Sequence, residues 1–220
     1  MPSKSFQRPP NSADRAEAKG GVEKGEIPLP KNSFRSAFHW QSLVGKLEAI
    51  RSSYLAKTAQ EPILQDVKEI FNYTLLIPGQ VLALGSNSKE KYLIQRVLGS
   101  GSEGCVYLAD SNAGEFAVKQ FYKPGSLLSH QRAYEAMKSG GVPMPNLVDR
   151  DRGKGCLIFE HIRAVPVSHL ILATPAGVSS LELRVLRGKL DVFVREHPGV
   201  DDHQIVVEIG SGKLFCVDPV

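Results

Sequence analysis

The residues best suited to chemistry form a glycine-rich run with the spacing G-x-G-x-x-G. A dinucleotide site needs a helix directly after these glycines, whereas Cys105 to Ala109 is a strand sequence. Glycines at a hairpin tip let backbone amides approach phosphate groups, where any Cβ would obstruct the approach. The run therefore predicts a phosphate-binding hairpin, and a plain hairpin turn is the alternative. The residues expected to contact the ligand are Gly99, Ser100, Gly101, Ser102, Gly104 and Val106.

A lysine on the next expected strand extends this pattern. Lys119 ends the sequence Ala117-Val118-Lys119, fifteen residues past Gly104. With the glycine run and Val106, this segment resembles the N-lobe of the eukaryotic-like protein kinase superfamily. The resemblance implies that Lys119 holds the α- and β-phosphates of ATP, that Ala117 makes room for adenine, and that Val106 lies on the base. Without the other motifs, Lys119 would be read as a solvated strand lysine.

The same resemblance implies a helix glutamate that pairs with the lysine and orients it. Glu135 is the only acidic residue between Lys119 and Asp149, and it lies within a helix expected from Ser126 to about Lys138. An exposed helix glutamate is the alternative.

A second implied element is the strand and hinge between two lobes. Residues 157–162, Leu-Ile-Phe-Glu-His-Ile, resemble it. Phe159 takes the position that gates the pocket behind adenine, and the backbones of Glu160 and Ile162 are expected to hydrogen-bond the base.

The second half of the chain departs from the kinase pattern. A kinase catalytic loop reads His-Arg-Asp with an Asn five residues after the Asp, which acts as the base. Alignment from His197 puts Gly199 at the base position and Gln204 at the Asn position. A shorter loop would instead let Asp202, or Asp201, act as the catalytic base. Ordinary turn acids are the alternative for both.

Alignment from the metal-binding end places Asp218-Pro219-Val220 where a kinase has Asp-Phe-Gly. The resemblance implies that Asp218, together with Gln204 or Asp202, holds Mg²⁺. The chain stops two residues after Asp218, which indicates either a truncated gene product or a minimal kinase-like fold.

Compact kinases with a curtailed C-lobe are known among effectors that bacterial pathogens deliver into host cells. The first hypothesis is therefore an atypical minimal kinase that transfers the γ-phosphoryl of ATP to Ser or Thr of a partner protein, such as a host protein. The alternative is a pseudokinase that works as a protein-interaction module. A third hypothesis is another ATP-dependent transfer, such as adenylylation. The expected location is the host cytoplasm, reached without a cleaved signal peptide, or otherwise the cytoplasm.

The helices and strands expected from the sequence position these residues. Together with the resemblance they predict an α+β, protein-kinase-like fold of two lobes. Residues 1–37 are rich in Pro, Gly, Ser, Lys and Glu and are expected to be a disordered tail. Residues 38–80 are expected to form a helical N-terminal extension that docks on the domain after it. Residues 81–162 are expected to form an antiparallel N-lobe with one helix, and residues 163–220 a strongly reduced C-lobe with one helix and a final hairpin.

Composition narrows the function classes. The 220 residues carry 27 Lys+Arg against 23 Asp+Glu without a basic block, which makes no case for nucleic acid. No apolar stretch is long enough for a membrane span. A monomer or a hetero-complex with the partner protein is expected. The cysteines lie 51 and 60 residues apart, which fits neither paired disulfides nor a zinc site and favours a reducing compartment. They are Cys105, Cys156 and Cys216.

Overall fold

The computed structural model describes residues 33–58, 75–83, 90–123 and 125–218. Residues 59–74 of the expected helical extension and residues 1–32 of the expected tail lie outside these ranges. Helix α1 (Ser33–Thr58) includes the last five residues, 33–37, of the expected tail. No helix among the described residues combines the length and the apolar character that a membrane span needs.

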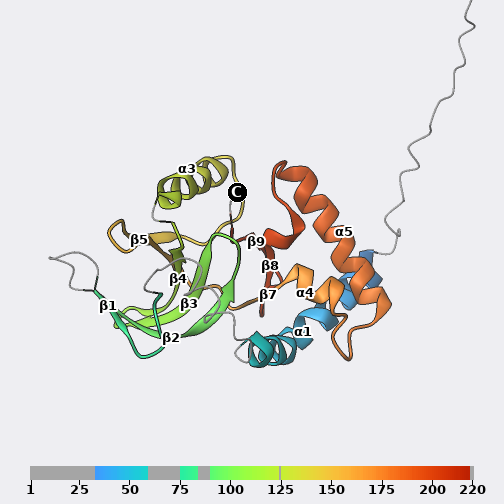
Figure 1. Cartoon of the computed structure of the whole chain (residues 1–220). Helices are drawn as coiled ribbons and strands as arrows, with labels where there is room; N and C mark the ends of the chain where they lie inside the picture. Colours follow the sequence, from blue (N-terminus) through green and yellow to red (C-terminus); the bar gives the residue numbers. More distant parts are fainter. Residues whose placement is uncertain (1–32, 59–74, 84–89, 124, 219–220) are drawn as a thin grey trace, which may run out of the picture. The chain divides into compact units, whose positions relative to one another are not determined.

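An antiparallel sheet of six strands, in the order β1-β2-β3-β4-β6-β5, forms the first lobe (Figure 1). Turn residues separate strand-forming runs at each hairpin, as the sequence predicts. The strands are β1 (Val81–Ala83), β2 (Lys91–Ser100), β3 (Gly104–Ser111), β4 (Gly114–Phe121), β5 (Leu147–Asp151) and β6 (Cys156–Glu160). The predicted α+β fold with an antiparallel first lobe is confirmed.

The sheet register puts the expected ligand-binding residues on one face. Val106 pairs with Lys119 across β3 and β4, and Ala117 pairs with Phe159 across β4 and β6. Because side chains two residues apart on a strand share a face, Ala117 and Lys119 point to the same side. The opposite face buries Val118 and Ile158 in a separate apolar cluster with Tyr107.

Helix α3 (Ser126–Ser139) packs beside this sheet (Figure 1). Its buried residues recur at the helical spacing of three and four, which defines one inward face. Tyr134 of this face packs edge-on against Phe159, and its hydroxyl donates to the Pro145 carbonyl at 2.7 Å. The inward residues are Leu127, His130, Gln131 and Tyr134.

The second lobe contains a small antiparallel sheet and two helices. The sheet has the strand order β7-β8-β9, and a 3₁₀ turn, η1 (Asp202–Gln204), leads into β8. The sequence did not predict β7 or α4, since three-residue strands and six-residue helices are too short to show a periodicity. The elements are β7 (Ala164–Pro166), α4 (Val167–Leu172), α5 (Ser180–Glu196), β8 (Ile205–Glu208) and β9 (Leu214–Cys216).

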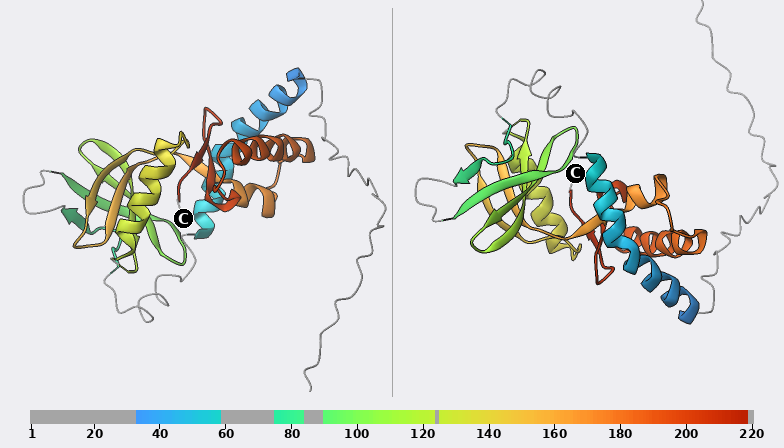
Figure 2. Two further views of the ribbon diagram at one scale, coloured as in Figure 1. Left: turned by 90° about the horizontal axis from the view of Figure 1, so that it is seen from above. Right: turned by 90° about the horizontal axis from the view of Figure 1, so that it is seen from below.

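Helix α1 belongs to the core of this second lobe. It lies beside α5 in both views of Figure 2, in agreement with the contacts between the two helices. Trp40, Leu43 and Leu47 share one apolar cluster with α4, α5 and β8. A Cβ on Gly212 of the β8–β9 turn would lie 2.6 Å from Val44, so the turn and the helix are in close contact.

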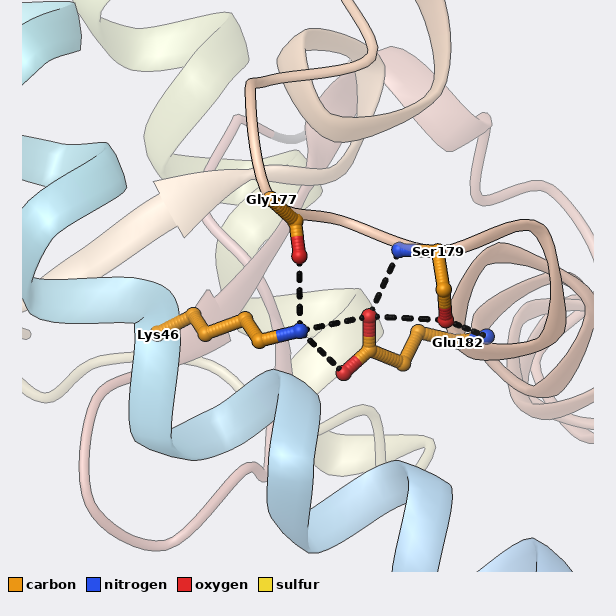
Figure 3. A network of polar contacts seen from close by, with 4 residues as sticks. All are labelled: Lys46, Gly177, Ser179 and Glu182. Carbon is orange, nitrogen blue, oxygen red and sulfur yellow. Dashed lines mark hydrogen bonds and ion pairs between the residues drawn. The ribbon is translucent and has the colours of Figure 1, made fainter.

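A partly buried polar contact adds to the apolar contacts of α1 (Figure 3). Lys46 Nζ donates to both carboxylate oxygens of Glu182, at 2.7 and 2.9 Å, and to the Gly177 carbonyl. Glu182 also closes a capping box with Ser179 at the start of α5. Burial alone would raise the pKa of Glu182, but hydrogen bonds from Lys46, Ser179 and Ser42 outweigh it and lower this pKa to about 2. The carboxylate is therefore charged at neutral pH, and it fixes α1 to the first turn of α5.

All three cysteines are buried and free. Burial raises the pKa of Cys156 to about 12 and that of Cys216 to about 11. Both are therefore neutral thiols at physiological pH, which makes them poor nucleophiles.

Candidate functional site

A cavity of about 510 Å³ lies between the first sheet, the β8–β9 end of the second lobe and α1. It brings together residues from distant parts of the chain. Each ligand-binding and metal-binding residue that the sequence predicts lines it. These are Gly99, Ser100, Gly101, Ser102, Gly104, Val106, Ala117, Lys119, Glu160, Ile162, Gln204 and Asp218.

The glycine loop lies at one end of the cavity. Its sequence positions require or favour glycine for two different physical reasons. A Cβ on Gly104 would lie 2.2 Å from the Gln120 carbonyl oxygen, so close packing of β3 on β4 requires glycine there. Gly99 and Gly101 have nothing within 4 Å of an added Cβ. At these two positions the open space leaves the backbone accessible to a ligand such as a phosphate.

Lys119 reaches the Asp218 carboxylate across the cavity. Its ammonium contacts Asp218 Oδ1, and it lies 5.1 Å from the centroid of the Phe121 ring. The Lys119 side chain is only 8% exposed, whereas that of Asp218 is 48% exposed. A nearly buried cation therefore meets a carboxylate that solvent or a ligand can reach.

The expected Lys119–Glu135 pair is absent from the structure. Glu135 is exposed and accepts a hydrogen bond from Gln131 Nε2 at 2.7 Å. His130 is the α3 residue that lies near Asp218, and five residues along a helix rotate a side chain by about 140°. Glu135 therefore points away from Asp218, whereas His130 lies beside it.

His130 connects the glycine loop with Asp218. Its Nε2 contacts Glu103, and its Nδ1 lies 3.8 Å from Asp218 Oδ1. The Tyr122 amide donates to the Glu103 carbonyl at 2.9 Å, which holds the loop residue in place. Sequence reasoning missed Glu103 and His130 because it looked only for an acidic partner of Lys119. The available signal was a histidine on the apolar face of α3.

Gln204 lies at the cavity but is not oriented as a metal ligand. Its Oε1 accepts the Asp201 amide hydrogen at 2.9 Å, and a backbone N–H can bond only to the oxygen of the carboxamide. Gln204 is 1% exposed, and among the described residues its Nε2 has no hydrogen-bond partner. The group left to face a ligand is thus a donor, which suits a phosphate oxygen better than a cation.

The structure does not bring the expected base, Asp202, to the cavity. Asp201 and Asp202 are exposed and line a separate surface hollow with Leu190 and Val194 of α5. The 3₁₀ turn at 202–204 turns the chain so that His203 and Gln204 line the cavity instead. Gly199, at the alternative base position, has no side chain to offer.

The far end of the cavity is bounded by the expected hinge and by α1. The Glu160 amide donates to the Asn146 carbonyl at 2.8 Å, and Ile162 follows the end of β6. Arg51, Tyr54 and Leu55 of α1 also line this end, which the sequence did not indicate. Burial, followed by repulsion from Arg96, lowers the pKa of Arg51. An arginine pKa is so high that Arg51 still carries its charge.

No protein-family model and no curated protein sequence matches the chain. Among solved structures, it is similar to kinase domains of Mycobacterium tuberculosis PknI. One is 19% identical with a TM-score of 0.40, and the match covers 66% of this chain and 62% of that chain. Another is 20% identical with a TM-score of 0.41 and coverages of 66% and 61%. A double mutant of that domain is 17% identical with a TM-score of 0.44 and coverages of 66% and 63%. The chain thus spans less than two thirds of the domains it matches.

Proposed function

We propose that this chain is an atypical minimal kinase that binds ATP in the cavity and transfers the γ-phosphoryl group to Ser or Thr of a partner protein. The observation that carries the proposal is the buried Lys119 ammonium at Asp218, beneath a glycine loop with open backbone. Phosphoryl transfer depends on positioning and charge neutralisation more than on covalent chemistry by the protein.

The lining of the cavity fits a nucleotide along its length. Val106 and Ala117 offer a small apolar surface for a base, next to the carbonyl of Glu160 and the backbone of Ile162. At the other end, Lys119, the loop amides and Gln204 Nε2 offer donors to phosphate oxygens. Mg²⁺ bound at Asp218 would supply charge neutralisation between the phosphates.

The proton of the acceptor hydroxyl needs a base, and we assign it to His203. Within the segment 197–204, His203 is the titratable side chain that lines the cavity. It is exposed, so an acceptor from solution can approach it. Histidine is the commonest general base in enzymes.

The second candidate is a nucleotide-binding module without catalysis. The position of Asp201 and Asp202 favours this candidate, because both lie outside the cavity. A kinase keeps its catalytic aspartate inside the active site. In this case a partner protein would recognise the nucleotide-bound form of the chain. That the partner belongs to a host cell follows in both cases from the resemblance to secreted effector kinases and is part of the proposal.

Incubation of the purified chain with γ-labelled ATP and a eukaryotic cell lysate separates the two candidates. The kinase predicts label on a lysate protein, at Ser or Thr, that is lost with Asp218→Ala. A matched control is Asp191→Ala, since Asp191 lies on α5 outside the cavity. Binding of ATP without label on any protein would support the module and contradict the kinase.

A further inference from the structure

Three side chains from three separate elements meet beside the cavity, where Glu103 and Asp218 belong to the lining and His130 lies next to both. Glu103 comes from the glycine loop, His130 from α3, and Asp218 from the segment after β9. One ligand atom of each, a carboxylate oxygen or an imidazole nitrogen, lies within 4.8 Å of the other two. Ligand atoms that share one cation at about 2.1 Å lie about 3–4 Å apart, so small side-chain shifts would complete a site.

The three positions are held by contacts outside the cluster. The Glu103 backbone is anchored by the Tyr122 amide. The His130 ring is 6% exposed and packs against Phe121, with 4.7 Å between the ring centroids. These contacts come from folding and not from a ligand, so much of the ordering cost of a site is already met.

Two neighbouring groups indicate the ligand that belongs here. The Lys119 ammonium already lies against Asp218 Oδ1, which marks this carboxylate as a place for positive charge. Gln204 Nε2 is a buried donor without a partner among the described residues, in the lining of the same cavity. Asp218 can hold a metal cation, and Gln204 Nε2 can donate to a phosphate oxygen. The two groups together therefore suit a phosphate ligand that carries a metal ion.

We propose that Glu103, His130 and Asp218 bind one divalent cation, and that the site prefers Mn²⁺ or Co²⁺ to Mg²⁺. It differs from the pair of Asp218 and Gln204 that the sequence predicts, and the Gln204 oxygen already accepts the Asp201 amide hydrogen. The preference follows from the imidazole, which binds first-row transition metals better than Mg²⁺. The proposal rests on the proposed function for its purpose, since the metal would serve the phosphates of ATP.

The direct test is pulsed electron paramagnetic resonance of Mn²⁺ bound to the full wild-type chain without nucleotide. Ligation by His130 predicts a ¹⁴N modulation of the Mn²⁺ spin echo. Competition with Mg²⁺ is expected to show Mn²⁺ binding at least about tenfold more tightly. Absence of the ¹⁴N modulation, or equal affinity for the two metals, would overturn the proposal without the need for any variant.

Variants then assign the ligands. His130→Asn and Glu103→Gln are each expected to weaken Mn²⁺ binding by about tenfold or more, and His130→Asn to abolish the preference over Mg²⁺. Glu115→Gln is the matched control, because Glu115 forms a similar pair with His161 at 3.0 Å outside the cluster. Unchanged Mn²⁺ affinity in folded His130→Asn, or an equal loss in Glu115→Gln, would contradict the assignment.

Lys119→Met separates this inference from the proposed function. It removes a cation that competes for Asp218, so Mn²⁺ affinity is expected to stay equal or to rise while ATP binding is lost. Lys119-dependent ATP binding without the ¹⁴N signal would end the metal proposal and leave the kinase-like function in place. The ¹⁴N signal without any ATP binding would support the metal site and contradict the proposed kinase-like function.

Discussion

The two walls of the cavity differ in how their residues reach it. The sheet wall, built from β2, β3, β4 and β6, presents its residues through strand register, with Val106 opposite Lys119 and Ala117 opposite Phe159. The opposite wall depends on a 3₁₀ turn and a short hairpin, and there Gln204 lies at the cavity while Asp202 does not. Local pattern is sufficient for the first wall, whereas tertiary packing decides the second.

The difference also separates binding from catalysis. Each ligand-contacting residue expected on the sheet wall lines the cavity, whereas the residue expected to remove a proton lies outside it. The residues expected to contact a ligand thus lie together at the cavity, whereas the residue expected to activate an acceptor does not. Four predictions test this contrast, in order of decreasing effect.

The largest expected effect concerns the proton on the second wall. His203→Asn is expected to lower turnover by ~10²–10⁴-fold, or roughly 3–5 kcal/mol, at nearly unchanged affinity for ATP, because a general base acts on the transition state. Asp202→Asn is expected to change turnover less than about twofold, since Asp202 is outside the cavity. Single-turnover rates at saturating ATP measure both. A large loss in Asp202→Asn alone would restore Asp202 as the base.

The next effect tests the rigidity of the sheet wall. Gly104→Ala places a Cβ 2.2 Å from the Gln120 carbonyl oxygen, and the forced backbone shift is expected to cost about 3 kcal/mol of unfolding free energy. Gly101→Ala meets open space and is expected to cost less than about 0.5 kcal/mol. Urea unfolding compares the two. Equal costs would mean that the hairpin adapts and that register does not hold this wall.

The third effect tests the attachment of α1. Lys46→Met leaves the buried Glu182 carboxylate without its cation, at an expected cost of about 2 kcal/mol at pH 7. Arg163→Met is the matched control, because both members of the Arg163–Glu48 pair are about half exposed, and its expected cost is below about 1 kcal/mol. Urea unfolding is again the measurement.

The pH dependence of this cost has a definite sign. The pKa of Glu182 is about 2 in the folded chain, below its ordinary value of 4.5. The stabilisation is therefore complete above about pH 4.5 and disappears as the pH falls toward 2. The difference between wild type and Lys46→Met is expected to narrow over this window. A difference that stays constant down to pH 2 would contradict the role of the ion pair.

The smallest effect is expected at the sequence-predicted partner of Lys119. Glu135 is exposed and bonded to Gln131, so Glu135→Gln is expected to change ATP affinity less than about twofold. Isothermal titration with ATP and Mn²⁺ measures it. A loss of tenfold or more would show that α3 rotates on binding and brings Glu135 to the lysine.

How far the sequence predicts this molecule depends on the range over which each feature is determined. The β2–β4 meander, α3, α5 and the final hairpin follow from periodicity and turn residues within each segment, and all are present. The structure does not bring Glu135 to Lys119, because the rotation of α3 about its axis depends on tertiary packing such as that of His130 against Phe121. The sequence could not predict that Arg51 of α1 lines the cavity, because no local pattern encodes where a helix docks.

The measurement that tests the central claim most directly is the melting temperature of the full chain with and without ATP and a divalent cation. At a ligand concentration about 100 times the Kd, binding adds about 2.7 kcal/mol, so a rise of roughly 5–10 °C is expected in wild type. Lys119→Met is expected to reduce this rise to below about 1 °C, because its ammonium lies where the phosphates must bind. The same rise in both proteins, or no rise in wild type with either Mg²⁺ or Mn²⁺, would contradict a nucleotide site built on Lys119 and Asp218.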